Sequence, residues 1–166
     1  MKAIINARIY DYQHYIENGF VIYDALIDSV GDMKDFSSEN IEEIIDAKGK
    51  LLMPGLINFH THIYSMLIRG YDMGAHPITF SDVLDQIWWK FDSHLNLNDL
   101  KASAYLYSIE SLEYGVTSLF DHNASGQIEG SLDALKEGLL LPAALCFESS
   151  DRFDVSSCIK ENTETL

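Results

Sequence analysis

The chain has 166 residues, of which 47% are hydrophobic and 22% charged, a composition that excludes an intrinsically disordered protein. Its 11 Lys and Arg residues face 26 Asp and Glu residues, and the net charge of −15 argues against binding to nucleic-acid phosphates. The sequence lacks an apolar run of the roughly 18 residues needed to cross a bilayer and a signal-peptide pattern, so we expect a cytoplasmic protein without a membrane partner.

The first 53 residues are predicted to form short β-strands separated by polar turns. Asn18-Gly19 and Lys48-Gly49 are typical turn dipeptides. The expected strands are Ala3–Ile9, Phe20–Ile27, Ile41–Asp46 and Lys50–Met53.

After Pro54 the pattern changes to alternating strands and helices, which is typical of a parallel α/β architecture. Thr79 and Asp82 resemble a capping box, and Gly115 stands where a helix C′ residue belongs. The expected strands are Leu56–His60, Val116–Phe120 and Pro142–Phe147. The expected helices are Ile78–Phe91, Asn98–Tyr114, Ser131–Leu139 and one that begins in Ser156–Leu166.

The second of these helices has the clearest periodicity. Its apolar residues recur with the helical period of 3.6. They are Ala102, Tyr105, Leu106, Ile109 and Leu112.

Polar side chains gather at the predicted carboxyl ends of the three strands, where a (β/α)8 barrel carries its reactive residues. They are His60 and His62, Asp121 and His122, and Glu148 and Arg152. A complete barrel needs about 250 residues. Only 106 residues follow His60 (166 − 60), enough for about three strand–helix units, so the sequence is interpreted as a fragment.

The His60-Thr61-His62 segment predicts a metal site. Side chains at positions i and i+2 of a strand point to the same face, so both imidazoles can reach one ion. Imidazole nitrogen suits zinc, iron, nickel or cobalt(II). The alternative is that the two histidines occur by chance, because an isolated HxH pattern is common.

The residues around this pair resemble a known family. Residues 54–62, PGLINFHTH, resemble the PG-hydrophobic-hydrophobic-x-x-HxH signature of the amidohydrolase superfamily. Arg69-Gly70 is similar to the RG of its deaminase and chlorohydrolase branch. Residues 87–92, 121–125 and 146–152 resemble the SsnA-type aminohydrolases, and the resemblance covers nearly the whole chain.

The resemblance implies an α/β fold. Residues 1–53 would be the N-terminal part of a small β-sandwich, and residues 54–166 the first three strand–helix units of an incomplete TIM barrel. The implied activity is hydrolysis of a C–N bond, the deamination of a small nitrogen heterocycle by a metal-bound hydroxide. His60 and His62 would bind zinc or another divalent metal such as iron. The remaining ligands and the catalytic acid are expected beyond Leu166, so the fragment alone should be inactive and hold metal weakly.

Four further residues are candidates for substrate binding. His122 would border the pocket, the alternative at this strand end being a structural hydrogen bond from a backbone N–H to Asp121. Trp89 could stack on a flat substrate, whereas its neighbour Trp88 fits the core. Glu148 follows the third strand, and Arg152 could clamp a substrate carboxylate or carbonyl.

A salt bridge from Arg152 to Asp151 or Asp154 is an equally consistent alternative. The rival functions are a dechlorinating or amide-cleaving hydrolase on the same scaffold and a non-catalytic fragment. A PHP-type phosphoesterase is disfavoured because 59 residues precede His60. Besides a small-molecule substrate, we expect a homo-oligomer or a self-associated fragment, because a partial barrel exposes sheet edges and apolar helix faces.

Overall fold

The computed structural model describes residues 1–164, and the chain divides into two compact units, Met1–Pro54 and Gly55–Leu166. Each unit is described by itself. Within the described residues, no helix combines the length and the apolar character needed to span a membrane.

The first unit is a five-stranded sheet in which β1 is central. Strand β1 pairs antiparallel with β2 and parallel with both β4 and β5, and β3 pairs antiparallel with β2. Its elements are β1 (Lys2–Tyr10), β2 (Tyr15–Tyr23), β3 (Ile27–Asp32), the 3-10 turn η1 (Met33–Asp35), β4 (Glu43–Asp46) and β5 (Leu51–Leu52).

One of the two predicted turns in this unit is wrong. Asn18-Gly19 lies inside β2, and the strand predicted over Phe20–Ile27 is the end of β2 and the start of β3. Gly19 serves packing, because a Cβ there would lie 2.7 Å from Ile9 Cδ1 and 2.8 Å from the Gly31 carbonyl oxygen. The turn at Lys48-Gly49 is confirmed, with φ angles of 52° and 73° between β4 and β5.

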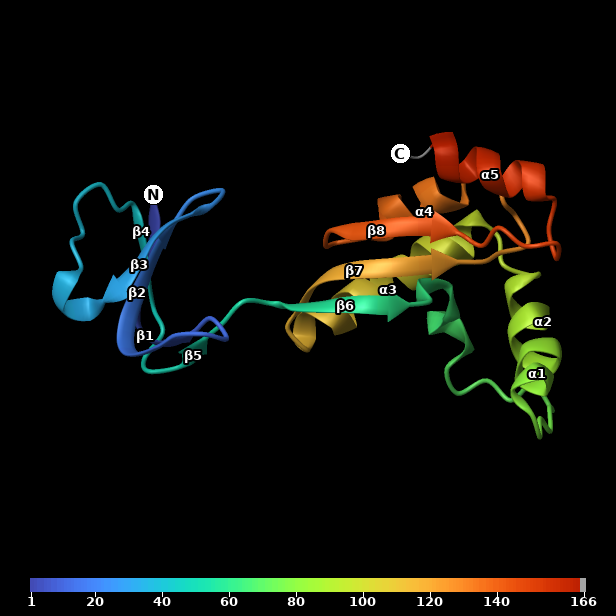
Figure 1. The fold of residues 1–166 in the computed structure, drawn as a ribbon, viewed down its shortest axis with the longest axis horizontal. Helices are drawn as coiled ribbons and strands as arrows, with labels where there is room; N and C mark the ends of the chain where they lie inside the picture. The colour runs from blue at the N-terminus through green and yellow to red at the C-terminus, as the bar shows by residue number, and fades with distance from the viewer. Residues whose placement is uncertain (165–166) are drawn as a thin grey trace. The chain divides into compact units, whose positions relative to one another are not determined.

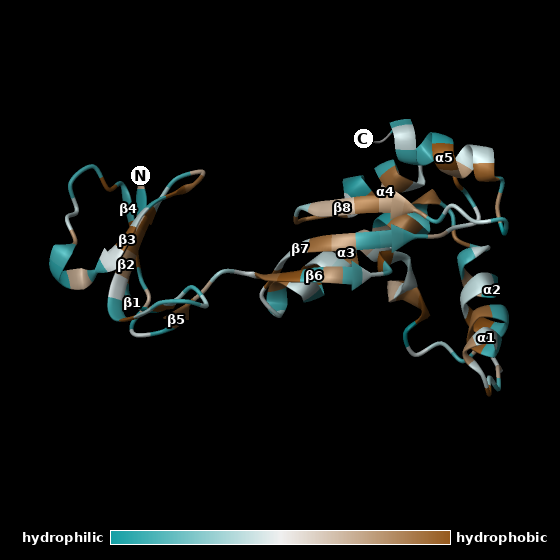
Figure 2. Cartoon of the chain, in the orientation of Figure 1, coloured by the Kyte–Doolittle hydropathy of each residue, from teal (hydrophilic) through white to brown (hydrophobic). Residues whose placement is uncertain are grey.

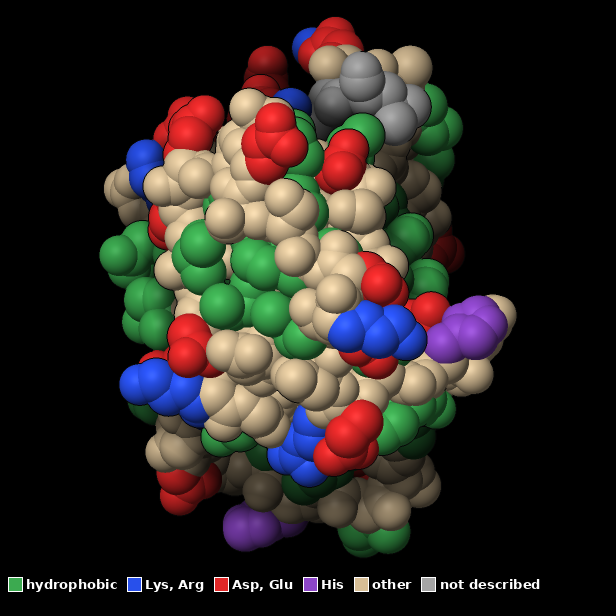
Figure 3. Space-filling view, turned by 90° about the vertical axis from the view of Figure 1, so that its left-hand side faces the viewer, with side chains coloured by type: hydrophobic (Ala, Val, Ile, Leu, Met, Phe, Trp, Pro, Cys, Tyr) green, Lys and Arg blue, Asp and Glu red, His purple; other side chains and the backbone are tan. Residues whose placement is uncertain are grey.

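The first unit buries a small core and leaves much apolar surface exposed. Ala7, Ile9 and Val21 form the core cluster. Figure 3 shows hydrophobic side chains at the surface of this unit, with acidic and basic side chains among them. Leu26 and Ile27, at the turn between β2 and β3, are 82% and 68% exposed. Exposed apolar surface of this kind favours contact with another protein segment or another protein molecule.

The second unit contains a parallel sheet in the order β6-β7-β8 (Figure 1). Its strands are β6 (Leu56–Thr61), β7 (Val116–Asn123) and β8 (Ala143–Phe147). All three strands match the predicted ones, and β7 runs three residues further than expected.

The predicted helices of this unit occur in the expected order. Its helical elements are the 3-10 helix η2 (Ile63–Ile68), α1 (Phe80–Val83), the π-helical turn η3 (Leu84–Trp88), α2 (Trp89–Asp92), α3 (Leu97–Glu113), α4 (Ser131–Gly138) and α5 (Val155–Glu164). The helix predicted over Ile78–Phe91 is divided into α1, η3 and α2, and the 3-10 helix η2 was not predicted. The capping box of Thr79 and Asp82 is confirmed, and so is the C′ role of Gly115, with a φ of 76°. Of the predicted helix Ser156–Leu166, residues 165–166 lie outside the described residues.

The apolar repeat that indicated α3 is not its packed face. Tyr105 and Leu106 are 51% and 44% exposed, whereas the buried residues are mostly small: Leu100, Ser103, Ala104, Ser108 and Ser111. The reason is close packing against α4, since a Cβ on Gly138 would lie 2.3 Å from the Lys101 carbonyl oxygen. At that separation only small side chains fit between the two helices.

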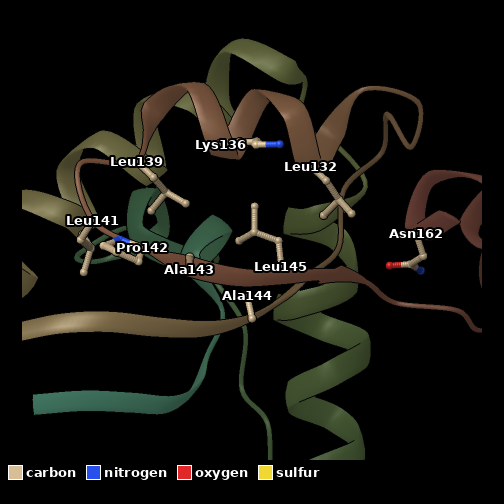
Figure 4. A pocket seen from close by; sticks show the side chains of 9 residues that line it. All are labelled: Leu132, Lys136, Leu139, Leu141, Pro142, Ala143, Ala144, Leu145 and Asn162. Atoms are coloured by element: carbon tan, nitrogen blue, oxygen red, sulfur yellow. The ribbon is translucent and has the colours of Figure 1, made fainter. Parts of the chain in front are cut away.

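Side chains of helix α5 form hydrogen bonds with the start of α4 and with β8. The Glu161 carboxylate accepts hydrogen bonds from the backbone N–H groups of Gly130 and Leu132 at the start of α4, at 2.9 and 2.8 Å. The Asn162 amide pairs with the backbone N–H and carbonyl of Phe147, at 2.8 and 2.9 Å, on the edge of β8. Figure 4 shows Asn162 beside a hollow of about 440 Å³ between β8 and α4, lined largely by leucine and alanine side chains.

Candidate metal and substrate site

The strands of the second unit become polar toward their carboxyl ends. Figure 2 shows β6 and β7 hydrophobic at their starts and hydrophilic near their arrowheads. Because the strands are parallel, these ends lie at one edge of the sheet. The structure therefore brings His60, His62, Asp121, His122 and Glu148 to the same edge.

The two histidines of the HxH segment lie together. Their ring centroids are 5.0 Å apart, with the planes at 89°. Thr61 between them is buried and donates its hydroxyl to Tyr107 of α3, at 2.7 Å. Asn58 reaches the same Tyr107 hydroxyl, at 2.9 Å, because a register shift interrupts β6 between Asn58 and Thr61. The strand thus presents Thr61 to the core and keeps both imidazoles out of it.

A hydrogen bond fixes the tautomer of His62. Its Nδ1 lies 2.8 Å from the backbone carbonyl oxygen of His122. A carbonyl oxygen can only accept, so Nδ1 carries the proton and Nε2 keeps its lone pair. Imidazoles that bind metals usually donate their other ring nitrogen in this way. The Nε2 atom of His62 is therefore prepared to act as a ligand.

His122 extends this cluster to three imidazoles. Its ring centroid lies 5.9 Å from that of His62. Burial and the neighbouring His62 lower the pKa of His122 below its ordinary value, and the nearby carboxylate of Glu148 opposes them. The ring is therefore neutral at pH 7, with one nitrogen that donates and one that accepts.

Asp121 points to the opposite, buried side of β7. Its Oδ1 accepts a hydrogen bond from the backbone N–H of Ile63, at 2.6 Å, so the structural hydrogen bond considered for this strand end is present, and it leaves the role of His122 open. Its Oδ2 is buried and has no hydrogen-bond partner among the described residues. Burial raises the pKa of Asp121 to about 7, although the Ile63 N–H lowers it.

Arg152 is paired with residues other than the two considered from the sequence. Its guanidinium binds Asp92, at 3.0 Å, and Glu148, at 2.7 Å, rather than Asp151 or Asp154. Asp92 was missed because its partner lies 60 residues along the chain and nothing in its local sequence indicates a pairing.

The two tryptophans flank different parts of the site. Trp88 packs against the core, as predicted, but its ring centroid also lies 6.3 Å from that of His62. Trp89 is 36% exposed, and its ring lies 4.9 Å from the Arg152 guanidinium carbon.

The donor set fits part of a zinc or iron site. Catalytic zinc usually has three protein ligands and a water molecule. Within residues 1–164, no group of three or more His, Cys, Asp or Glu side chains could hold a metal ion. His60 and His62 offer two imidazole donors at this edge, fewer than the three protein ligands of a usual catalytic zinc site. A hollow of about 230 Å³ is lined by residues that include His60, His122 and Cys146.

Comparison with curated proteins gives relatives that are named as deaminases. The chain is 31% identical over 161 residues to the 5-methylthioadenosine/S-adenosylhomocysteine deaminase of Halothermothrix orenii, covering 84% of this chain and 36% of that protein. It is 35% identical over 107 residues to the 5'-deoxyadenosine deaminase of Methanosarcina acetivorans, covering 64% and 23%. The chain thus spans about a third or less of the length of these relatives.

Solved structures share the fold. The guanine deaminase of E. coli superposes with a TM-score of 0.74 at 16% identity, over 98% of this chain and 42% of that one. A mutant atrazine chlorohydrolase from Arthrobacter aurescens, complexed with zinc and atraton, gives 0.71 at 23%, over 92% and 37%. The predicted fold, the N-terminal portion of a TIM barrel preceded by part of a small β-sandwich, is confirmed. Residues 51–165 match the model of the amidohydrolase family, to which this chain therefore belongs.

Proposed function

We propose that this chain is part of a metal-dependent hydrolase that removes an amino group from a small nitrogen heterocycle. The observation that carries the proposal is the pair of imidazoles, 5.0 Å apart, at the carboxyl edge of a parallel sheet. The names of the relatives support deamination, and two of them act on adenosine derivatives by name. Because the chain spans only part of these relatives, the activity belongs to the complete protein.

We infer a role for each residue of the site. His60 and His62 would hold zinc or another divalent metal such as iron, His62 through its Nε2 atom. The bound metal would lower the pKa of a water molecule toward about 7 and so supply a nucleophile at neutral pH. Residues 1–164 contain no group of three His, Cys, Asp or Glu side chains that could hold a metal ion, so we infer that the remaining ligands, with the general acid and base, come from further strands.

The substrate would lie beside His122 and Trp89. A neutral His122 can both donate to and accept from a ring nitrogen or amino group of the heterocycle. Trp89 offers a partly exposed aromatic face on which a flat ring can stack. Glu148 and Arg152, which form an ion pair at 2.7 Å, would complete the rim of this pocket.

The test is an assay of the complete gene product loaded with Zn²⁺ or Fe²⁺. A panel of purines, pyrimidines and adenosine derivatives should include at least one compound that releases ammonia, with the corresponding oxo compound as product. Chlorotriazines in the same panel, followed by chloride release, test the dechlorinating alternative. No ammonia from any compound at full metal occupancy would contradict the deaminase proposal.

We also propose that the 166-residue chain self-associates. Phe59 and Ile57 on β6 are 70% and 49% exposed, and Tyr105 on α3 is 51% exposed. A second copy that covers these side chains would remove their apolar surface from water. Sedimentation equilibrium between low and high micromolar concentration should show dimers or larger species. A monomer throughout that range would rule the association out.

A further inference from the structure

The guanidinium of Arg152 is almost fully engaged within the chain. Its Nε and Nη2 donate to the two carboxylate oxygens of Glu148, at 3.3 and 2.7 Å. Its Nη1 and Nη2 donate to the two oxygens of Asp92, at 3.4 and 3.0 Å. These four hydrogen bonds leave one of the five N–H donors of an arginine. A bidentate clamp on a substrate would therefore require Arg152 to release one of the carboxylates.

Burial makes these ion pairs costly to break. The side chain of Asp92 is 1% exposed, and those of Arg152 and Glu148 are 17% and 25% exposed. The Arg152 guanidinium also lies over two aromatic rings, 4.9 Å from Trp89 and 4.6 Å from Phe153. Loss of the cation would leave the Asp92 carboxylate buried without a counter-charge, a strongly unfavourable state.

The three charged residues join elements that lie far apart in sequence. Asp92 ends α2, whereas Glu148 and Arg152 follow β8. Figure 1 shows α1 and α2 beyond the arrowheads of the parallel strands. The loop after β7 holds the same end of α2, since the Gly126 N–H donates to the Asp92 carbonyl oxygen at 2.7 Å.

The segment that is held in this way carries Trp88 to the histidines. The π-helical turn η3 ends at Trp88, and single π turns recur at functional sites. The Trp88 ring lies 6.3 Å from His62 and 6.1 Å from Tyr64 between centroids.

We propose that Asp92, Arg152 and Glu148 form an ion triad that latches residues 80–92 to the end of β8 and thereby holds Trp88 against His62. Arg152 is then a positioning residue and not a substrate clamp. Asp92 is the buried anchor of the latch. The inference rests on the proposed function in one respect, namely that His62 belongs to the proposed metal site.

The test follows the histidine ring signals of the 166-residue chain by NMR, without metal or substrate. Arg152→Gln removes the cation, and Asp92→Asn removes the buried charge at nearly constant shape. Because the ring current of Trp88 acts on His62, both variants should shift the His62 ring signals. Both should also accelerate amide exchange in residues 84–92 at least tenfold relative to β7.

Two controls keep the experiment specific. His14 is exposed in the first unit, so its signals should not move in either variant. Lys101→Gln breaks an exposed ion pair with Glu137 and should leave the His62 ring signals unchanged.

Arg152→Lys is a conservative variant that keeps the charge but loses the planar fork of donors. It should therefore fold and give an intermediate shift of the His62 ring signals.

Three results would overturn the latch. One is an unchanged His62 in Arg152→Gln. The second is a shift in Arg152→Gln that Asp92→Asn does not reproduce, since Asp92 is too buried to touch a substrate. The third is equal acceleration of exchange across the second unit, which would indicate a general loss of stability. The readout needs no catalysis, so its failure is distinct from that of the deaminase assay.

Discussion

Replacing His60 or His62 by alanine should strongly weaken metal binding and activity in the complete gene product. Each imidazole would be one ligand of a small set, and His62 is held for this role by the carbonyl of His122, at 2.8 Å. Loss of residues that only support a ligand typically costs 10–100-fold in metal affinity or activity. Loss of a ligand itself should therefore lower kcat/KM by more than about 100-fold. Metal content after dialysis and steady-state kinetics measure both effects.

Two further variants show whether this loss is specific. His14→Ala changes an exposed histidine of the first unit and should leave metal content and rate unchanged. His122→Ala keeps the backbone carbonyl that orients His62, so the protein should retain its metal while substrate turnover falls. If His60→Ala and His62→Ala bind metal as well as the parent protein, the assignment of these ligands is wrong.

The fold of the second unit follows closely from its sequence. Each strand is a short apolar run bounded by turn residues, and caps such as Thr79 with Asp82 and Gly115 mark the helix ends locally. The spacing of His60 and His62 likewise requires only strand geometry. These features depend on residues near one another in the chain, which is why the pattern predicts them.

The errors arise where distant residues decide the structure. Gly19 was interpreted as a turn residue, but the contacts that require glycine come from Ile9 and Gly31 on the neighbouring strands. The packed face of α3 is set by the close approach of Gly138 on α4. No local sequence pattern predicts such contacts, because each involves a residue that is distant in the sequence and adjacent only in the folded chain.

The hydrogen bonds and ion pairs around the histidines could not be predicted from the sequence for the same reason. Asp92 and Arg152 are 60 residues apart in sequence, and so are His62 and the His122 carbonyl. Parallel strands with helical connections bring such residues to one sheet edge only after the fold has formed. The sequence predicts that Arg152 lies near the site. Only the structure shows that most of its N–H donors are already bonded to Asp92 and Glu148.

Asp121→Asn should change how stability depends on pH. Burial raises the pKa of the Asp121 carboxyl to about 7 in the folded chain, against an ordinary value of 3.8. The stability that this group contributes is therefore fully present below pH 3.8 and is lost as the pH rises through about 7. A pKa difference of this size corresponds to a loss of about 4 kcal/mol, an order-of-magnitude figure.

Asparagine does not ionise, so the stability of the variant does not fall with the ionisation of this side chain. Its side-chain oxygen can still accept from the Ile63 N–H, but its NH₂ group would replace Oδ2, which has no partner among the described residues. An unpaired buried donor costs about 1–3 kcal/mol at every pH. The variant should therefore be less stable than the parent chain at pH 4, where little of the parent's stability has been lost, and more stable at pH 8, where the loss exceeds this penalty.

Urea unfolding of the metal-free chains across this range measures the effect. The difference in free energy of unfolding between variant and parent cancels the titration of the other carboxylates, which both chains share. Asp133→Asn, on the exposed side of α4, controls for the loss of one negative charge from an acidic protein. If the Asp121→Asn difference stays constant from pH 4 to pH 8, burial does not raise the pKa of this carboxyl. The Oδ2 atom must then have a partner that supports its charge, and the polar edge of this sheet would be more open to water than its burial implies.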